Sequence, residues 1–286
     1  MKPTASGELQ AADAYCLMLA DEHYENFSVA SKLLAPPLRQ HLARIYAYCR
    51  TTDDLGDESG SRDAARTRLR HWRDEVEQLF AGAAPSHPVL IALSETVTAC
   101  RMQPAPFLDL IAANVQDQEV STYETWADLI AYCRNSAAPV GRMVLNVFGM
   151  YNSYTERLSD DVCIGLQLAN HAQDVTRDAV LGRTYLIAAD IRDGGMQHAT
   201  RIMVDRARDL LASGRALERA APPGLRFQLA LYRMGGLAIC DAIARIDYRT
   251  DLQRPTVTKN VKFGLLVRAI ALSLTPARQA QPAETA

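Results

Sequence analysis

Apolar residues recur at spacings of three and four along most of the chain. In residues 38–49, Leu38, Leu42 and Ile45 follow this spacing, and residues 129–148 show it again. Such a repeat places the apolar side chains on one face of an α-helix. Alternating runs of β-branched residues bounded by tight hairpin turns, which mark strands, are missing from the sequence. The sequence therefore predicts an all-α fold.

Proline and glycine residues divide the chain into about ten predicted helices. These breakers lie at Pro36 and Pro37, 60–62, 82–88, 104–106, Gly194 and Gly195, 222–224, and Pro255. None of these breaker segments is long enough to be a domain linker. We therefore expect one helical domain over residues 12–275, followed by a flexible C-terminal tail over residues 276–286.

Composition excludes several classes of protein. With 286 residues and 48% apolar content, the chain can bury a large core. The formal net charge is −2, from 31 basic and 33 acidic side chains spread along the chain, so no nucleic-acid-binding footprint is present. The six cysteines include no Cys-x-x-Cys pair, which favours free thiols over disulfides or a zinc site.

The sequence predicts a cytoplasmic location, because its N-terminal segment lacks the charged start and apolar stretch of a secretory signal. The most apolar late stretch, residues 263–274, is interrupted by Arg268 and is shorter than the roughly 20 residues that span a bilayer. We interpret it as a helix that faces the core. Peripheral contact with the inner face of the membrane is the alternative.

The first acidic cluster is an Asp-Asp-x-x-Asp motif formed by Asp53, Asp54 and Asp57. On a helix these carboxylates lie close together, where they repel one another and meet the negative end of the helix dipole. Magnesium offsets both effects, because it takes oxygen ligands and bridges to substrate phosphates. A solvated helix end is the alternative for this motif taken alone. Arg50, one turn before Asp54, is either an ion-pair partner or a diphosphate contact.

A second polar stripe consists of Gln167, Asn170, Asp174 and Asp178, at spacings of three and four. We interpret residues 160–178 as one helix. Its neighbouring positions are apolar, so the stripe is predicted to line a cavity, where two carboxylates need a cation. A solvated helix face is the alternative.

The segment after the second stripe adds two candidate ligand contacts. Gly182 can end the helix, so that Arg183 and Tyr185 point back toward the carboxylates. A plain helix-capping role for Arg183 is the alternative.

Two such clusters suit the ionisation of an allylic diphosphate. The metal ions stabilise the leaving diphosphate, and the remaining carbocation needs an apolar wall. We expect the two acidic helices to face each other across a bundle. Side chains that suit the wall, or that are ordinary core, are Phe27, Tyr46, Tyr132, Val140 and Phe148.

The chain resembles the squalene/phytoene (head-to-head) type of trans-isoprenyl diphosphate synthases. The resemblance covers nearly the full chain and rests on residues 23–34, 46–58, 116–119, 132–141 and 167–185. Within that family it is most similar to the hydroxysqualene synthase branch of bacterial hopanoid pathways. The segments ENFSVASKLL, QDQEV and YCRNSAAPVGR carry this closer resemblance.

The resemblance implies an isoprenoid-synthase-type helical bundle with a central cavity. It implies a magnesium-dependent conversion of presqualene diphosphate and water into hydroxysqualene and diphosphate, on the route to squalene and hopanoids. Two or three Mg²⁺ ions are expected, and NADPH is not. Association with other enzymes of that pathway is left open.

The resemblance also implies roles for individual residues. The implied metal ligands are Asp53, Asp54, Asp57, Asn170, Asp174 and Asp178. The implied catalytic residues are Asp53, Asp57, Asp174, Asp178, Tyr132 and Tyr248. The implied substrate contacts are Asn26, Phe27, Tyr46, Arg50, Ala137, Val140, Gly141, Gln167, Asn170, Arg183, Tyr185 and Arg254.

Two positions depart from the family pattern. Gly56 replaces a bulkier residue and is expected to loosen a helix end, and His171 replaces an apolar or aromatic residue. His171 is interpreted as a buried, hydrogen-bonded side chain, with proton acceptance as the alternative. Other functions left open are presqualene diphosphate or phytoene synthase, a terpene cyclase, and a non-catalytic scaffold of the same fold.

Overall fold

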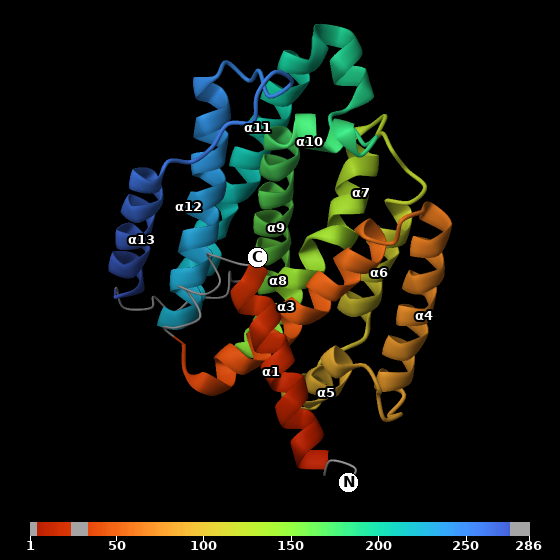
Figure 1. Ribbon diagram of the computed structural model, residues 1–286. Helices are drawn as coiled ribbons and strands as arrows, with labels where there is room; N and C mark the ends of the chain where they lie inside the picture. The colour runs from red at the N-terminus through yellow and green to blue at the C-terminus, as the bar shows by residue number, and fades with distance from the viewer. Residues whose placement is uncertain (1–4, 24–33, 275–286) are drawn as a thin grey trace, which may run out of the picture. The chain divides into compact units, whose positions relative to one another are not determined.

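The computed structural model describes residues 5–23 and 34–274 (Figure 1). The described helices are α1 (Ala5–His23), α3 (Pro36–Asp57), α4 (Arg62–Phe80), α5 (Pro88–Cys100), α6 (Ala105–Gln116), α7 (Trp126–Ser136), α8 (Ala138–Val147), α9 (Ser153–Gln173), α10 (Val175–Val180), α11 (Ala188–Ala220), α12 (Pro223–Arg245) and α13 (Lys259–Ser273). These residues form no strand, and extended pairing is limited to a bridge between Thr122 and Thr184. The predicted all-α fold is confirmed.

Most of the predicted breakers lie at helix boundaries, whereas the boundaries between α6 and α11 were not predicted by any of them. Proline lies in the first turn of α3, α5, α6, α8 and α12, where a missing N–H costs nothing. Asn152 starts α9 with a capping box to Thr155. The predicted break at Gly194 and Gly195 is a kink instead, because Gly195 adopts φ 78° while α11 continues beyond it.

The chain divides into two compact units. The first consists of Met1–Val120 and Arg134–Tyr151, and the second of Ser121–Cys133 and Asn152–Ala286. The chain passes from the second unit to the first inside α7. The single domain expected over residues 12–275 stays a prediction. Asn26, Phe27 and the expected tail over residues 276–286 lie outside the described residues.

In the first unit, α3 packs against α1, α4, α5, α6 and α8. Tyr48 of α3 is fully buried, meets Phe107 edge-on at 5.1 Å between ring centroids, and stacks on Trp72 at 5.8 Å. Its hydroxyl donates to Phe107 O at 2.8 Å, and Trp72 Nε1 donates to Thr52 Oγ1 at 3.0 Å. Buried aromatic groups with satisfied polar ends fix the register of α3, and therefore of its C-terminal turn.

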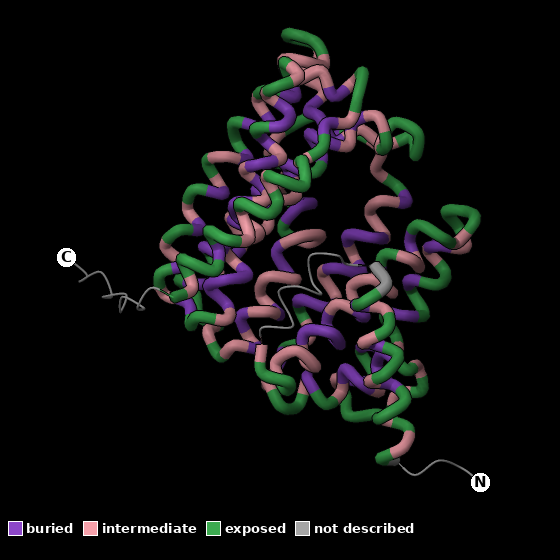
Figure 2. Tube along the Cα trace, turned by 60° about the vertical axis from the view of Figure 1, so that its left-hand side comes forward, coloured by how far each residue is buried: buried purple, intermediate pink, exposed green. Residues whose placement is uncertain are grey.

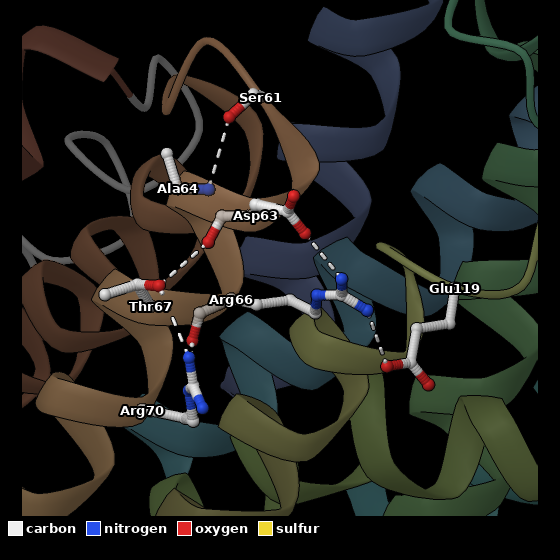
Figure 3. A network of polar contacts seen from close by, with 7 residues as sticks. All are labelled: Ser61, Asp63, Ala64, Arg66, Thr67, Arg70 and Glu119. Atoms are coloured by element: carbon white, nitrogen blue, oxygen red, sulfur yellow. Dashed lines mark hydrogen bonds and ion pairs between the residues drawn. The ribbon is translucent and has the colours of Figure 1, made fainter.

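A polar network holds the start of α4 near the end of α6 (Figure 3). Ser61 caps α4 by accepting from Ala64 N at 3.2 Å. Arg66 pairs with Asp63 and also donates from Nη1 to Glu119 Oε1 at 3.2 Å. These groups are exposed, so the ion pairs add little to stability. Their main effect is to hold Glu119 and its neighbours beside α4.

In the second unit, α11 packs closely on α9 and α12. A Cβ atom built on Gly214 of α11 would lie 2.4 Å from Val162 Cγ2 of α9. On Gly236 of α12 it would lie 2.8 Å from Leu166 Cδ2. These glycines therefore permit the close approach of three helices. Figure 2 shows buried and exposed residues alternating along the helices, as expected for amphipathic elements.

Gly214→Ala is expected to lower the free energy of unfolding by about 1–3 kcal/mol, because the added methyl overlaps the stiff, buried Val162 side chain. The matched variant is Gly235→Ala, whose new Cβ would meet nothing within 4 Å. That variant should raise stability by about 0.5–1 kcal/mol through helix propensity. Urea unfolding measures both. A Gly214→Ala protein as stable as Gly235→Ala would contradict the packing described for α9 and α11.

The apolar stretch 263–274 lies on α13, which packs on α12. Ala269 is its one buried residue within Lys259–Ser273, whereas Phe263 is 68% exposed and Val267 50%. The interpretation of this stretch as a core-facing helix is therefore wrong for most of its apolar side chains. Peripheral membrane contact stays a prediction. In the part of the chain that is described, every helix is too short or too polar to cross a membrane.

Candidate active site

The first acidic cluster lies at the C-terminal end of α3, in the first unit. Asp53 Oδ1 accepts a hydrogen bond from Asn114 Nδ2 of α6 at 3.2 Å. Asp53 is exposed to solvent on one side, yet desolvation by the surrounding protein raises its pKa from 3.8 to about 6. The bond from Asn114 lowers this pKa, and the charges of Asp57 and Asp54 raise it. A cation would relieve this accumulation of negative charge.

Arg50 pairs with the same cluster. Its Nη2 lies 2.6 Å from Asp54 Oδ1 and 3.5 Å from Glu58 Oε1. Its Nε is buried and has no hydrogen-bond partner in the described part of the chain. The ion-pair interpretation of Arg50 is thus confirmed, and one buried N–H donor remains for a ligand.

Gly56 allows α6 to approach this turn of α3. Gly56 is buried, and a Cβ atom there would lie 2.8 Å from Asn114 Oδ1. Gln118 Nε2 donates to Gly56 O at 3.3 Å and to Asn114 O at 3.2 Å. The missing side chain of Gly56 therefore makes room for the amide that contacts Asp53, and the loosening of the helix end stays a prediction.

Asn114 was not singled out from the sequence. It is one of three polar residues in a mainly apolar helix, and its spacing forms no polar stripe. Gln118 lies in the segment 116–119 that carried the family resemblance, but nothing in that segment assigned it a contact. Both amides lie at the close approach to Gly56, where Asn114 contacts Asp53 and Gln118 contacts Gly56 O.

The second cluster lies in the second unit, and its helix is interrupted. Residues 160–178 were expected to form one helix, but α9 ends at Gln173 and α10 begins at Val175. Asp174 separates them with φ −98° and ψ 18°. The backbone still bonds from Asp174 N to Asn170 O at 2.8 Å and from Asp178 N to Asp174 O at 2.9 Å. The polar stripe therefore persists through the interruption.

Arg254 lies against the second cluster. Its Nε donates to Asp174 Oδ1, and its Nη2 donates to Gln173 Oε1 at 3.3 Å. Gln173 Nε2 in turn donates to Pro255 O at 2.8 Å, which anchors the segment between α12 and α13. The structure thus brings together Asp174 and an arginine that lies 80 residues away in the sequence.

Tyr248, expected to be catalytic, follows α12 in a left-handed conformation, with φ 58°. Its neighbour Asp247 has φ 54°. Two successive non-glycine residues in this region mark a strained turn, which the surrounding structure must hold in place. The Tyr248 side chain makes no hydrogen bond within the described part of the chain, so its catalytic role stays a prediction.

An aromatic stack adjoins Asp178. His171 is buried and stacks on Tyr185 with 3.7 Å between ring centroids, and Tyr185 stacks on Tyr132 at 5.6 Å. His171 Nε2 lies 3.1 Å from Gln167 Nε2, and its Nδ1 lies 3.9 Å from Asp178 Oδ2. With the Gln167 amide as donor, the ring proton lies on Nδ1, toward Asp178. His171 is therefore buried and hydrogen-bonded, as the sequence indicated.

The remaining candidate contacts occupy half-buried positions. In the first unit these are Tyr46, Ala137, Val140 and Gly141, and in the second unit Arg183. Gly182 ends α10 with φ 69°, as predicted for a left-handed helix stop. Tyr123 also belongs to the aromatic stack, 5.5 Å from Tyr132, although its sequence context gave no indication of this.

Comparison with known proteins decides the family. Residues 20–261 match the sequence profile described as squalene/phytoene synthase. The chain belongs to the squalene/phytoene synthase family. Relatives of this family are prenyl-diphosphate-utilising synthases, so the chain is an enzyme of that class, as predicted.

Named relatives cover most of the chain. A hydroxysqualene synthase from Rhodopseudomonas palustris is 34% identical over 208 residues, which are 68% of this chain and 70% of that protein. Phytoene synthase 3, chloroplastic, from Zea mays is 30% identical over 304 residues, 98% of this chain and 70% of that protein. The resemblance predicted from the sequence is therefore confirmed.

A solved structure also supports the branch within the family. Squalene synthase HpnC from Alicyclobacillus acidocaldarius superposes with a TM-score of 0.79 at 42% identity, over 86% of this chain and 99% of that one. A dehydrosqualene synthase with a TM-score of 0.82 at 23% identity shows the shared fold alone. Both neighbours agree with the helical isoprenoid-synthase fold expected from the sequence.

The donor sets of this enzyme suit magnesium. The first cluster offers carboxylate oxygens, and the second offers carboxylate and amide oxygens, which hard divalent cations prefer. In the described residues, no three His, Cys, Asp or Glu side chains gather closely enough to hold a metal ion by themselves. Magnesium commonly keeps several waters and completes its coordination with substrate phosphates, so such incomplete sets fit a metal that arrives with a diphosphate.

Proposed function

We propose that this enzyme converts presqualene diphosphate and water into hydroxysqualene and diphosphate, with Mg²⁺ and without NADPH. The observation that carries the diphosphate part is that each acidic cluster is paired with an arginine, Arg50 with Asp54 and Arg254 with Asp174. The hydroxysqualene synthase and HpnC relatives support the choice of reaction.

Specific residues would hold the metal and the leaving group. Asp53 and Asp57 would ligate Mg²⁺ in the first unit, and Asp174 and Asp178 in the second. Bound Mg²⁺ supplies neutralising charge to the diphosphate as the carbon–oxygen bond breaks. Arg50 can donate its unpaired Nε–H to the diphosphate.

Arg254 has two roles in this proposal. It balances the charge of Asp174 in the metal-free protein, and its planar guanidinium can donate two parallel hydrogen bonds to diphosphate oxygens. Lysine could not reproduce the two-pronged contact.

The aromatic stack would stabilise the carbocation that remains after diphosphate leaves. The faces of Tyr132 and Tyr185 carry negative electrostatic potential, which attracts a cation. They are held by stacking against His171, which is itself held by Gln167. A rigid π surface beside the acidic stripe can stabilise the carbocation without reacting with it.

A second candidate function is head-to-head condensation of two prenyl diphosphates, favoured by the phytoene synthase relatives. It would use the same aspartates.

The test is incubation with Mg²⁺ and either presqualene, farnesyl or geranylgeranyl diphosphate, followed by mass spectrometry. We expect product with presqualene diphosphate and none with farnesyl or geranylgeranyl diphosphate. A product from farnesyl or geranylgeranyl diphosphate alone would support the condensing function, and no product from any would favour a non-catalytic scaffold.

Gly56→Ala is expected to raise the Mg²⁺ concentration for half-maximal activity about tenfold, as the loss of a supporting hydrogen bond does in metal sites. The new methyl group displaces the Asn114 amide, so Asp53 loses its orienting donor. Asn114→Ala removes the same bond from the other helix and should give a similar shift. Mg²⁺ titrations of activity measure both, and a Gly56→Ala enzyme with unchanged Mg²⁺ dependence would contradict this role.

A further inference from the structure

A cavity of about 920 Å³ lies in the second unit between α11, α12 and α13. Five arginine and two acidic side chains line it, together with apolar residues of α12 and α13. None of these residues belongs to the acidic clusters or to the aromatic stack. Its volume is at the upper end of the range of small-molecule sites.

Two of the arginines that line the cavity are held in place by hydrogen bonds. Arg233 pairs with buried Glu218 through Nε, and through Nη2 at 3.2 Å. Arg226 donates to Glu218 O at 2.9 Å and to Ala221 O at 2.8 Å, where α11 ends. The hydrogen bonds of these side chains hold α11 against α12, so this part of the cavity is rigid.

The other three arginines are unpaired. Arg215, Arg219 and Arg268 are exposed and have no ion-pair or hydrogen-bond partner among residues 5–23 and 34–274. The acidic Asp241 on the rim is already paired with Arg208 at 2.7 Å, and Glu218 with Arg233. Three positive charges therefore line the cavity without a partner in the described part of the chain, an arrangement that attracts an anion.

The opposite wall is apolar. Leu237 of α12 and Val261 and Leu265 of α13 line the cavity beside Met234. Since α13 buries only Ala269, much of its apolar surface is free to contact a ligand. A small inorganic anion would use the arginines and leave this wall solvated. A neutral hydrocarbon would use the wall and leave the arginines without a partner.

The cavity is distant from the second acidic cluster. Gly214, next to Arg215, packs on Val162 of α9. Asp174 lies 12 residues further along (174 minus 162), which is about 18 Å at the rise of an α-helix. A ligand head group on Arg215 is therefore separate from one bound at Asp174.

We propose that this cavity binds a single-chain amphiphile with an anionic head group. The phosphate or carboxylate contacts Arg215, Arg219 and Arg268, and the hydrocarbon chain lies along α12 and α13. This site is independent of the proposed reaction, because it uses none of the residues that the reaction requires.

The test is isothermal titration calorimetry of the full chain in EDTA with dodecyl phosphate below its micellar concentration. Inorganic phosphate and dodecyl maltoside serve as head-group-only and neutral-chain probes, and dodecanoate replaces phosphate by carboxylate. We expect dodecyl phosphate to bind, both control probes to bind at least tenfold more weakly, and Arg268→Gln or Arg215→Gln to weaken binding about tenfold each. Arg245→Gln, an exposed residue on α12 outside the cavity, should leave the affinity unchanged.

The same titration on Asp53→Asn and Asp174→Asn separates this site from the proposed active site. Unchanged affinity in both variants supports the proposal. Dodecyl phosphate binding that is lost in either aspartate variant, or that is unaffected by Arg268→Gln and Arg215→Gln, would overturn it. Dodecanoate binding as tight as dodecyl phosphate would identify the ligand class as carboxylates as well as phosphates, within the same proposal.

Discussion

Asp53→Asn and Asp174→Asn are each expected to lower kcat/KM by about 10³-fold or more, the loss typical when a charge-stabilising group at a reacting centre is removed. Asparagine keeps the shape of each side chain but lacks the negative charge that holds Mg²⁺. Diphosphate release from presqualene diphosphate, measured over a range of Mg²⁺ concentrations, gives the effect. Excess Mg²⁺ should not restore the rate.

A matched control separates this effect from a general loss of charge. Asp74 of α4 is exposed and lies in the same unit as Asp53, and Asp74→Asn should leave kcat/KM within about twofold of the unmodified enzyme, as for other surface substitutions. If Asp53→Asn and Asp174→Asn retained full activity, the chain would have to be a scaffold that keeps the family fold without its chemistry.

Asp53→Asn should also change stability in the opposite direction from activity. The folded-state pKa of Asp53 is about 6, above its ordinary value of 3.8, so folding disfavours its ionised form. The unmodified metal-free protein therefore loses stability relative to Asp53→Asn as pH rises from about 4 through 6. Thermal unfolding in EDTA at pH 4, 5, 6 and 7 should show the Tm difference growing in favour of the variant. A Tm difference that stays constant with pH would contradict the raised pKa of the Asp53 carboxyl group.

The largest stability effect is expected at the buried ion pair of Arg233 and Glu218. Arg233→Leu leaves the Glu218 carboxylate buried without its partner, which should lower the free energy of unfolding by about 3–5 kcal/mol. Both side chains are less than 10% exposed, so water cannot replace the lost bonds. Urea unfolding at neutral pH measures the loss.

The double variant Arg233→Leu with Glu218→Leu is the control for this pair. It removes both charges, so it should recover most of the stability lost by Arg233→Leu. The exposed pair of Arg73 and Glu77 gives a second comparison, since Arg73→Ala should cost under about 0.5 kcal/mol. Equal losses for Arg233→Leu and Arg73→Ala would contradict the burial described for Glu218.

Local pattern was sufficient for the helices and for the aspartates. The spacing of Leu38, Leu42 and Ile45 predicted α3, and the prolines predicted where α3, α5, α6 and α12 begin. Likewise, the close spacing of Asp53, Asp54 and Asp57 predicted a candidate site, because the repulsion between carboxylates one helical turn apart can be inferred from the sequence alone.

Contacts between segments that are distant in the sequence could not be predicted from local spacing. Asn114 reaches Asp53 only because Gly56 lets two helices approach, and Arg254 reaches Asp174 from a loop 80 residues away. Both contacts depend on tertiary packing, which leaves no periodic signal. The interruption of the helix at Asp174 was not predicted, because the polar spacing continues through it. The i to i+4 backbone hydrogen bonds on both sides of Asp174 preserve that spacing.

The sequence also could not predict which faces of the C-terminal helices are buried. Residues 263–274 have the apolar content of a core helix, but α13 packs on α12 with Ala269 as its one buried residue and leaves Phe263 exposed. Hydropathy records composition, whereas burial depends on which neighbours are present. The basic cavity beside α13 likewise assembles arginines from three helices and leaves no motif in the sequence.

The central claim is that the enzyme captures water at a carbocation formed from presqualene diphosphate. Incubation with presqualene diphosphate and Mg²⁺ in [18O]water, followed by mass spectrometry of the product, tests it most directly. The proposed reaction predicts hydroxysqualene that carries one 18O atom in its hydroxyl group, formed without NADPH. An unlabelled alcohol, a hydrocarbon product, or turnover of farnesyl diphosphate alone would contradict it.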